Sequence, residues 1–154
     1  MDGIVLVGNP PFLPTGYGKQ LHHMGQYLKD DYSVLHICDF GYGLAPFEFE
    51  GVKVAPVESK PGNLSNAYIE KTVSRWISQE SIDKWIMIVL GDAHKWGDLF
   101  ATFPSAVIAP IDSEYCLDSV LETLSQSIPV AMSSFGLEQL VKWGFNEAFL
   151  LPHV

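Results

Sequence analysis

Two glycines at the start of a predicted helix are the residues of this chain best placed to bind an anion. The apolar run at residues 4–7 leads into a loop rich in proline and glycine, which opens into a helical pattern at residues 18–29. The first amide groups of a helix carry partial positive charge and attract phosphate or carboxylate groups. Gly16 and Gly18 would let the backbone approach such a group closely, or they serve only the shape of a helix start.

The same loop matches two nucleotide-binding motifs in part. Residues 16–18 form G-x-G, but Leu21 stands where a dinucleotide-binding fingerprint has a third small residue. Asp39 ends a predicted strand where such folds place an acid that binds ribose. The P-loop motif fails, because Gln20 follows the lysine where Ser or Thr is required. A stand-alone nucleotide-binding module is therefore one hypothesis.

Polar residues and glycines follow several predicted strands. They occupy residues 9–18, 39–43, 91–94, 112–115 and 133–134. Because the carboxyl ends of parallel strands share one edge of a sheet, we expect these loops to converge on a single cleft. Trp96 and Tyr42 lie in loops of that edge and could stack on a sugar ring or an apolar acceptor.

The elements that must position these loops alternate between strand and helix. Strand-like runs occur at residues 4–7, 32–38, 85–90, 106–111, 129–132 and 148–151, with a hairpin at 47–57 that turns at Glu50-Gly51. Helical patterns occur at 18–29, from Pro61-Gly62-Asn63 to about residue 80, at 94–100, from Leu117 to residue 124, and at 134–143. The run at 85–90 is typical of a strand covered on both faces, and Trp76 and Trp85 fit core positions. This order predicts a Rossmann-like three-layer α/β/α sandwich with a mainly parallel sheet.

Length and charge limit the classes of function. The 154 residues are 47% hydrophobic with a net charge of −9, as expected of a single folded domain of residues 1–154 that does not bind nucleic acid. There is no signal-peptide pattern and no apolar run of about 20 residues, so we expect a cytoplasmic protein, with peripheral membrane contact still open. Cys38 and Cys116 are expected to be reduced and structural. No spaced set of ligands predicts a metal site.

Three segments resemble family-4 retaining glycosyltransferases of the GT-B fold. They are NPPFLPTGYGKQ near the start, API-DSEY, and MSSFG with the later Pro152-His153. In that family a short strand runs into MSxFG, and a later strand ends in PHG. The resemblance covers most of the chain but only the amino-terminal half of such an enzyme. It implies one of two Rossmann-like domains that face each other across a cleft, with the carboxyl-terminal donor-binding domain absent from this chain.

The resemblance also implies roles for individual residues. Gly16, Tyr17 and Gly18 match the loop that approaches the donor diphosphate, and His153 would lie at the interdomain seam. Asp112, the catalytic candidate, stands where many members have a histidine near the sugar, and it could accept a hydrogen bond from a hydroxyl. The candidates for the acceptor pocket are Asp92, His94, Glu114, Ser133 and Ser134. The two serines could instead cap the helix that they begin.

The expected function is transfer of a sugar from a nucleotide-sugar donor to an acceptor hydroxyl. The departing diphosphate would take the proton, so this half needs no strong general base, no metal and no other cofactor. The isolated chain would then fold without turnover. Two alternatives are the stand-alone nucleotide-binding module and a partner-binding subunit, which a long exposed apolar face at the carboxyl edge would support.

Overall fold

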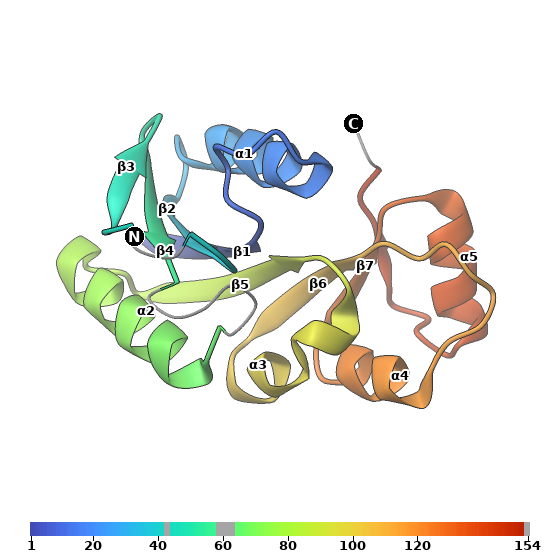
Figure 1. Cartoon of the computed structure of the whole chain (residues 1–154). Coiled ribbons are helices and arrows are strands. Elements are labelled where there is room, and N and C mark those ends of the chain that lie inside the picture. Colours follow the sequence, from blue (N-terminus) through green and yellow to red (C-terminus); the bar gives the residue numbers. More distant parts are fainter. Residues whose placement is uncertain (42–43, 58–63, 153–154) are drawn as a thin grey trace. The chain divides into compact units, whose positions relative to one another are not determined.

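The protein has the α/β architecture that the alternation of strands and helices predicts. A computed structural model describes residues 1–41, 44–57 and 64–152. Its eight strands follow the order β3-β4-β2-β1-β5-β6-β7-β8 in a mostly parallel sheet flanked by helices (Figure 1). The chain divides into two compact units, residues 1–87 and 88–154, and the boundary falls within β5 (Lys84–Leu90).

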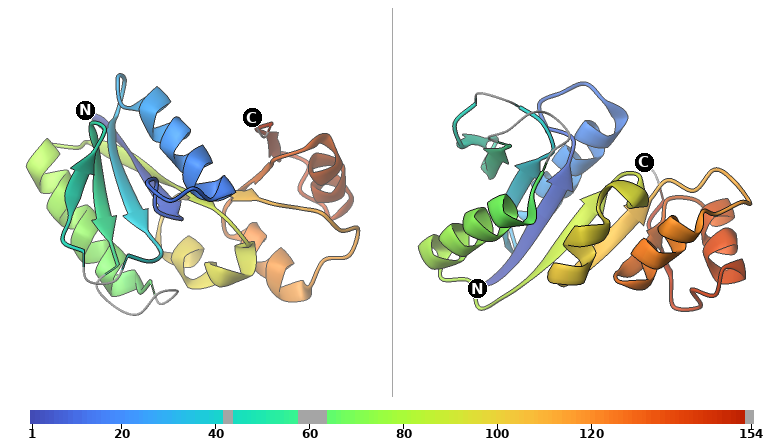
Figure 2. Two further views of the ribbon diagram at one scale, coloured as in Figure 1. Left: turned by 45° about the horizontal axis from the view of Figure 1, so that its top comes forward. Right: turned by 60° about the horizontal axis from the view of Figure 1, so that its bottom comes forward.

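Unit 1 contains three parallel strands and one antiparallel edge strand. β1 (Asp2–Gly8), β2 (Ser33–Cys38) and β4 (Val52–Pro56) are parallel, and β3 (Phe47–Phe49) pairs antiparallel with β4. The β3–β4 turn is at Glu50 and Gly51, with φ of 48° and 84°, which confirms the predicted hairpin. α1 (Gly16–Leu28) and α2 (Asn66–Glu80) cover opposite faces of these strands (Figure 2).

The apolar stripe of α2 explains why this segment packs as a helix. Of the four apolar residues that recur at helical spacing, Ile69, Val73 and Trp76 are buried and Ile77 is half-buried. The indole of Trp76 packs where a β-carbon on Gly3 would lie only 2.4 Å from it, and its Nε1 donates to Ser33 Oγ at 3.2 Å. The amino-terminal end of the sheet in unit 1 is thus closed by a fitted aromatic side chain.

Unit 2 continues with short elements after the end of β5. They are η1 (Ala93–Lys95), α3 (Gly97–Thr102), β6 (Ser105–Ala109), α4 (Asp118–Ser125), β7 (Ile128–Ala131), α5 (Ser134–Lys142) and β8 (Phe149–Leu150). β6, β7 and β8 are parallel, and Val107, Leu124 and Leu140 are buried between strands and helices. No described helix is both long and apolar enough to cross a bilayer.

Three sequence expectations about packing are wrong in detail. Trp85 and two further side chains of β5 are only half-buried, so this strand is not fully covered on both faces. Leu117 is 70% exposed because it precedes α4 as its N-cap residue rather than joining the buried stripe. The helix predicted at residues 94–100 is divided into η1 and α3, with the non-helical Trp96 between them.

Candidate functional site

A cavity of about 200 Å³ in unit 2 brings together three of the residues predicted to act in the site. Asp92 and His94 follow β5, and Asp112 follows β6, so all three lie beyond the carboxyl ends of neighbouring elements. Leu117, Val120 and other apolar side chains form the rest of the wall. Polar groups on an apolar wall are usual in ligand sites, although this cavity is smaller than the ~300 Å³ of most of them.

The turn after β5 is built to present Asp92. Gly91 has a φ of +147°, a conformation that residues with a β-carbon rarely adopt, and its amide donates to the Ile108 carbonyl at 3.3 Å. The Asp92 carboxylate lies 2.9 Å from Lys95 Nζ, and the Lys95 amide donates to the Asp92 carbonyl at 3.0 Å. Lys95 therefore neutralises part of the charge of Asp92, whereas Asp112 has no ion pair among the described residues.

Two hydrogen bonds hold the exposed middle of the loop between β6 and α4. The Tyr115 amide donates to Ser113 Oγ at 3.1 Å, and Trp143 Nε1 donates to the Glu114 carbonyl at 3.4 Å. Glu114 itself does not line the cavity, but its backbone carbonyl holds Trp143, which does. Trp143, at the end of α5, lines the cavity and is held against the loop by this hydrogen bond.

The aromatic residues at the cavity differ from those predicted. Trp96 is only 7% exposed and is buried beneath Gly91, so the expectation that it stacks on a sugar is wrong. Tyr42 lies outside the described residues. Trp143 and the 91% exposed Tyr115 are the aromatic side chains that line the cavity. No spacing in the sequence links Trp143 to Asp112, because tertiary packing alone brings the end of α5 to this loop.

Cys116 also lines the cavity but is not a nucleophile. Burial of the thiol and the nearby Asp118 carboxylate raise its pKa, so it stays protonated near neutral pH. Cys38 is buried in β2, where burial and Asp39 raise its pKa to about 12. Both cysteines are free, in agreement with the sequence prediction.

Ser133 and Ser134 lie at the start of α5 and do not line this cavity. Ser133 Oγ accepts a hydrogen bond from the Gly136 amide at 3.0 Å, which is the N-cap role predicted as the alternative to ligand binding. Ser134 is the first residue of the helix and is exposed.

Ser133→Ala should lower the free energy of unfolding by about 1 kcal/mol, because the Gly136 amide loses its acceptor. Ser134→Ala should change it by less than about 0.5 kcal/mol, since this residue makes no cap. Urea denaturation of the two variants and the wild type measures both effects. Equal stability of the two variants would contradict the cap assignment.

The glycine loop of unit 1 closes on itself at the start of α1. Thr15 Oγ1 accepts from the Gly18 amide at 3.0 Å and from Asn9 Nδ2 at 3.1 Å. A β-carbon on Gly18 would lie 2.6 Å from the Pro10 carbonyl oxygen, whereas one on Gly16 would meet nothing within 4 Å. The close approach at Gly18 is therefore made by the chain's own loop, and the open position at this helix start is Gly16.

A buried histidine anchors this loop to the sheet. His36 of β2 is 1% exposed and is hydrogen-bonded to the backbone of Asn9. Its pKa is lowered from 6.5 to about 4, chiefly by burial, with a smaller contribution from the neighbouring His22. His36 is therefore neutral at physiological pH, and its Nε2 has no partner among the described residues.

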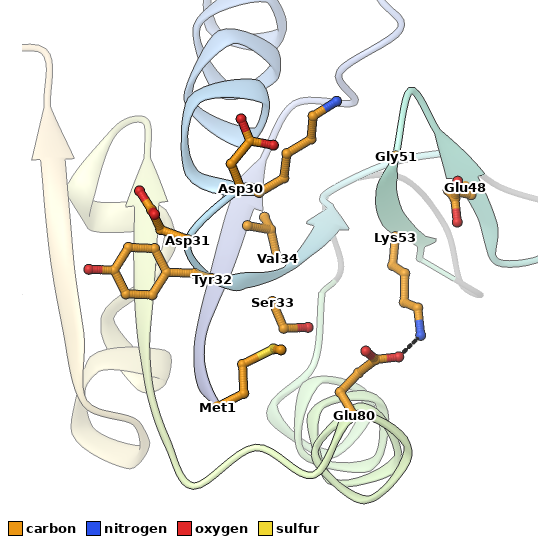
Figure 3. A pocket seen from close by; sticks show the side chains of 11 residues that line it. Met1, Asp30, Asp31, Tyr32, Ser33, Val34, Glu48, Gly51, Lys53 and Glu80 are labelled. Carbon is orange, nitrogen blue, oxygen red and sulfur yellow. Dashed lines mark hydrogen bonds and ion pairs between the residues drawn. The ribbon is translucent and has the colours of Figure 1, made fainter.

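A hollow of about 260 Å³ at the opposite edge of unit 1 contains none of the predicted site residues. Met1, just before β1, and Ser33, the first residue of β2, lie on its wall, so it faces the amino-terminal ends of these strands (Figure 3). Asp30 and Asp31 face it with Lys53 and Glu80, which form an ion pair. This edge of a parallel sheet is not where ligands of such folds bind.

His153 lies outside the described residues, and the described residues contain no group of three or more His, Cys, Asp or Glu that could hold a metal ion. No protein-family model matches this chain, and no curated protein matches its sequence significantly.

Proposed function

We propose that this chain is the acceptor-side domain of a glycosyltransferase of the GT-B fold. With a donor-binding domain, it would transfer a sugar from a nucleotide-sugar to an acceptor hydroxyl. The observation that carries the proposal is the unit 2 cavity, which is lined by Asp92, His94, Asp112 and Trp143. Carboxylates accept hydrogen bonds from hydroxyl groups, and an indole offers an apolar face to a ring, so this set suits a polyhydroxylated acceptor.

The chemistry assigned to this half is positioning rather than proton transfer. Asp112 is the carboxylate of the cavity without an ion pair among the described residues, so it is the group proposed to orient the attacking hydroxyl. Asp92, tied to Lys95, would hold a second hydroxyl. The leaving diphosphate would accept the proton.

Asp112→Asn should weaken binding of a neutral glycoside by about tenfold, because a hydrogen bond to a charged group is replaced by a weaker one. Titration of the isolated chain with methyl glycosides, followed by amide chemical shifts, measures this. Wild-type shifts should concentrate at residues 92–95 and 112–117. Glu147→Gln, at an exposed position of the same unit, makes the same change of charge and should bind as the wild type.

Equal affinity of the Asp112 and Glu147 variants, or shifts that avoid the cavity, would contradict the assignment of the site. The enzyme class has its own test, which is the reading frame after Val154. A second α/β domain with two glutamates separated by seven residues would support a GT-B transferase, and an unrelated sequence there would contradict it.

A nucleotide-binding module is the second candidate. The Asp39 amide donates to the Gly8 carbonyl at 2.9 Å, which places this acidic residue beside the glycine loop as in dinucleotide-binding folds. Micromolar binding of NAD, with shifts at residues 8–18 and 39, would favour this candidate. The occupied Gly18 amide argues against it.

A partner-binding subunit is the third candidate. Phe149, Leu150 and Leu151 at β8 are 61%, 40% and 45% exposed, and β8 pairs with β7. Exposed apolar side chains on an edge strand suit a protein contact, including a contact with a donor-binding domain.

A further inference from the structure

Another cavity of unit 1 is lined by none of the residues predicted to act in transfer. It measures about 450 Å³ and is lined by α2 on one side and by the β3–β4 hairpin on the other. Phe47, Val54 and Trp76 give it apolar walls. Lys53, Lys71 and Arg75 supply positive charge.

This concentration of positive charge is exceptional for the chain. The protein carries a net charge of −9 and nine basic residues, and Arg75 is its only arginine. Lys53 is paired with Glu80, but neither Lys71 nor Arg75 forms an ion pair with a described residue. Glu48 is the single carboxylate among the described residues that line the cavity.

The placement of the two unpaired cations on α2 is unfavourable for the helix by itself. Lys71 and Arg75 are spaced i,i+4, which puts two like charges on one face and costs a few tenths of a kcal/mol. The sequence has no Asp or Glu three or four residues from either cation that could compensate. An arrangement that costs stability and lines a cavity points to a bound anion.

We propose that this cavity binds an organic phosphate, a phosphate group carried on an apolar or aromatic body. Arg75 can donate two parallel hydrogen bonds to phosphate oxygens, and Lys71 adds a point charge one turn away. Thr72, between them on the cavity wall, offers a hydroxyl. The apolar walls at Phe47 and Trp76 would cover the organic part. This site is separate from the helix start at Gly16 and does not depend on the proposed transfer reaction.

Phenyl phosphate is a suitable probe, with inorganic phosphate and phenol as its two halves. Amide chemical shifts of the wild type should move at residues 68–79 on addition of phenyl phosphate. Phenyl phosphate should bind about fivefold or more tighter than inorganic phosphate, because only it also buries an apolar surface. Arg75→Gln and Lys71→Gln should each weaken binding of phenyl phosphate by about tenfold, since glutamine keeps the helix but removes the charge.

Lys84→Gln is the matched control, because it removes one positive charge from an exposed position outside the cavity. It should leave the affinity within about twofold of the wild type. The proposal is overturned if the Lys71 and Arg75 variants bind phenyl phosphate as tightly as Lys84→Gln does. It is also overturned if the chemical-shift changes fall at residues 15–18, or if millimolar phenyl phosphate shifts no amide of α2. Binding of methyl glycosides to Arg75→Gln should match the wild type, so failure here is distinguishable from failure of the proposed transferase.

Discussion

Lowering the pH from about 7.5 to about 4 should reduce the free energy of unfolding of this protein by about 3 kcal/mol through His36 alone. The imidazole is buried in β2, and burial holds its pKa at about 4 in the folded chain, against 6.5 without burial. Between these two values the unfolded chain binds a proton at this side chain and the folded chain does not. Stability is therefore complete above pH 6.5 and is lost as the pH falls toward 4.

The variants His36→Gln and His36→Met test this dependence, since neither side chain titrates in that range. Both should lose about 3 kcal/mol less than the wild type over the same change of pH, whatever their stability at neutral pH. His23→Gln, a histidine substitution at an exposed position of α1, retains His36 and should keep the wild-type loss attributed to it. Urea denaturation at a series of pH values supplies the data. Parallel curves for the wild type and both His36 variants would show that His36 is not the group that titrates.

The same titration has a consequence for the glycine loop. His36 is bonded to the backbone of Asn9, whose side chain in turn donates to Thr15 at the start of α1. A proton on His36 would place an uncompensated charge beneath this loop, so acid should open the loop before the sheet unfolds. Amide exchange at residues 9–15 reports such local opening.

The repeating elements of the fold were predictable from the sequence because they depend on local patterns. The stripe of Ile69, Val73 and Trp76 specifies α2, and the pair Glu50-Gly51 specifies a tight hairpin turn. The carboxyl ends of parallel strands share an edge by topology, which explains why Asp92 and Asp112 meet at one cavity. Each of these inferences needs only the spacing of residues along a few turns or one strand.

What the sequence missed depends on contacts between distant segments. Trp143 reaches the cavity because the end of α5 packs against residues 110–117, and no periodicity encodes that contact. Trp96 has a loop-like sequence context but is buried, because η1 and α3 fold it under Gly91. The cations of the 450 Å³ cavity come from two elements, Lys53 from β4 and both Lys71 and Arg75 from α2, and only the fold brings the strand and the helix together.

Gly18→Ala should lower the free energy of unfolding by about 1–3 kcal/mol, because the new methyl group meets the backbone rather than a side chain that can move. Its β-carbon would lie 2.6 Å from the Pro10 carbonyl oxygen and 2.9 Å from that of Leu13. Gly16→Ala is the matched control one half-turn earlier, where a β-carbon meets nothing within 4 Å and alanine improves helix propensity. That variant should be as stable as the wild type or more stable by up to about 1 kcal/mol.

The pair of variants also separates two roles of the glycine loop. If Gly18 served only to let a ligand approach, Gly18→Ala would keep the wild-type stability and lose only the binding of UDP. Urea denaturation measures the stability, and a titration with UDP measures the binding. The structure predicts instead that Gly18→Ala loses stability, because Thr15 and the Pro10 carbonyl already occupy the space around Gly18. Any diphosphate at this helix start must then be bound from the side of Gly16, so Gly16→Ala is the substitution expected to weaken binding without loss of stability.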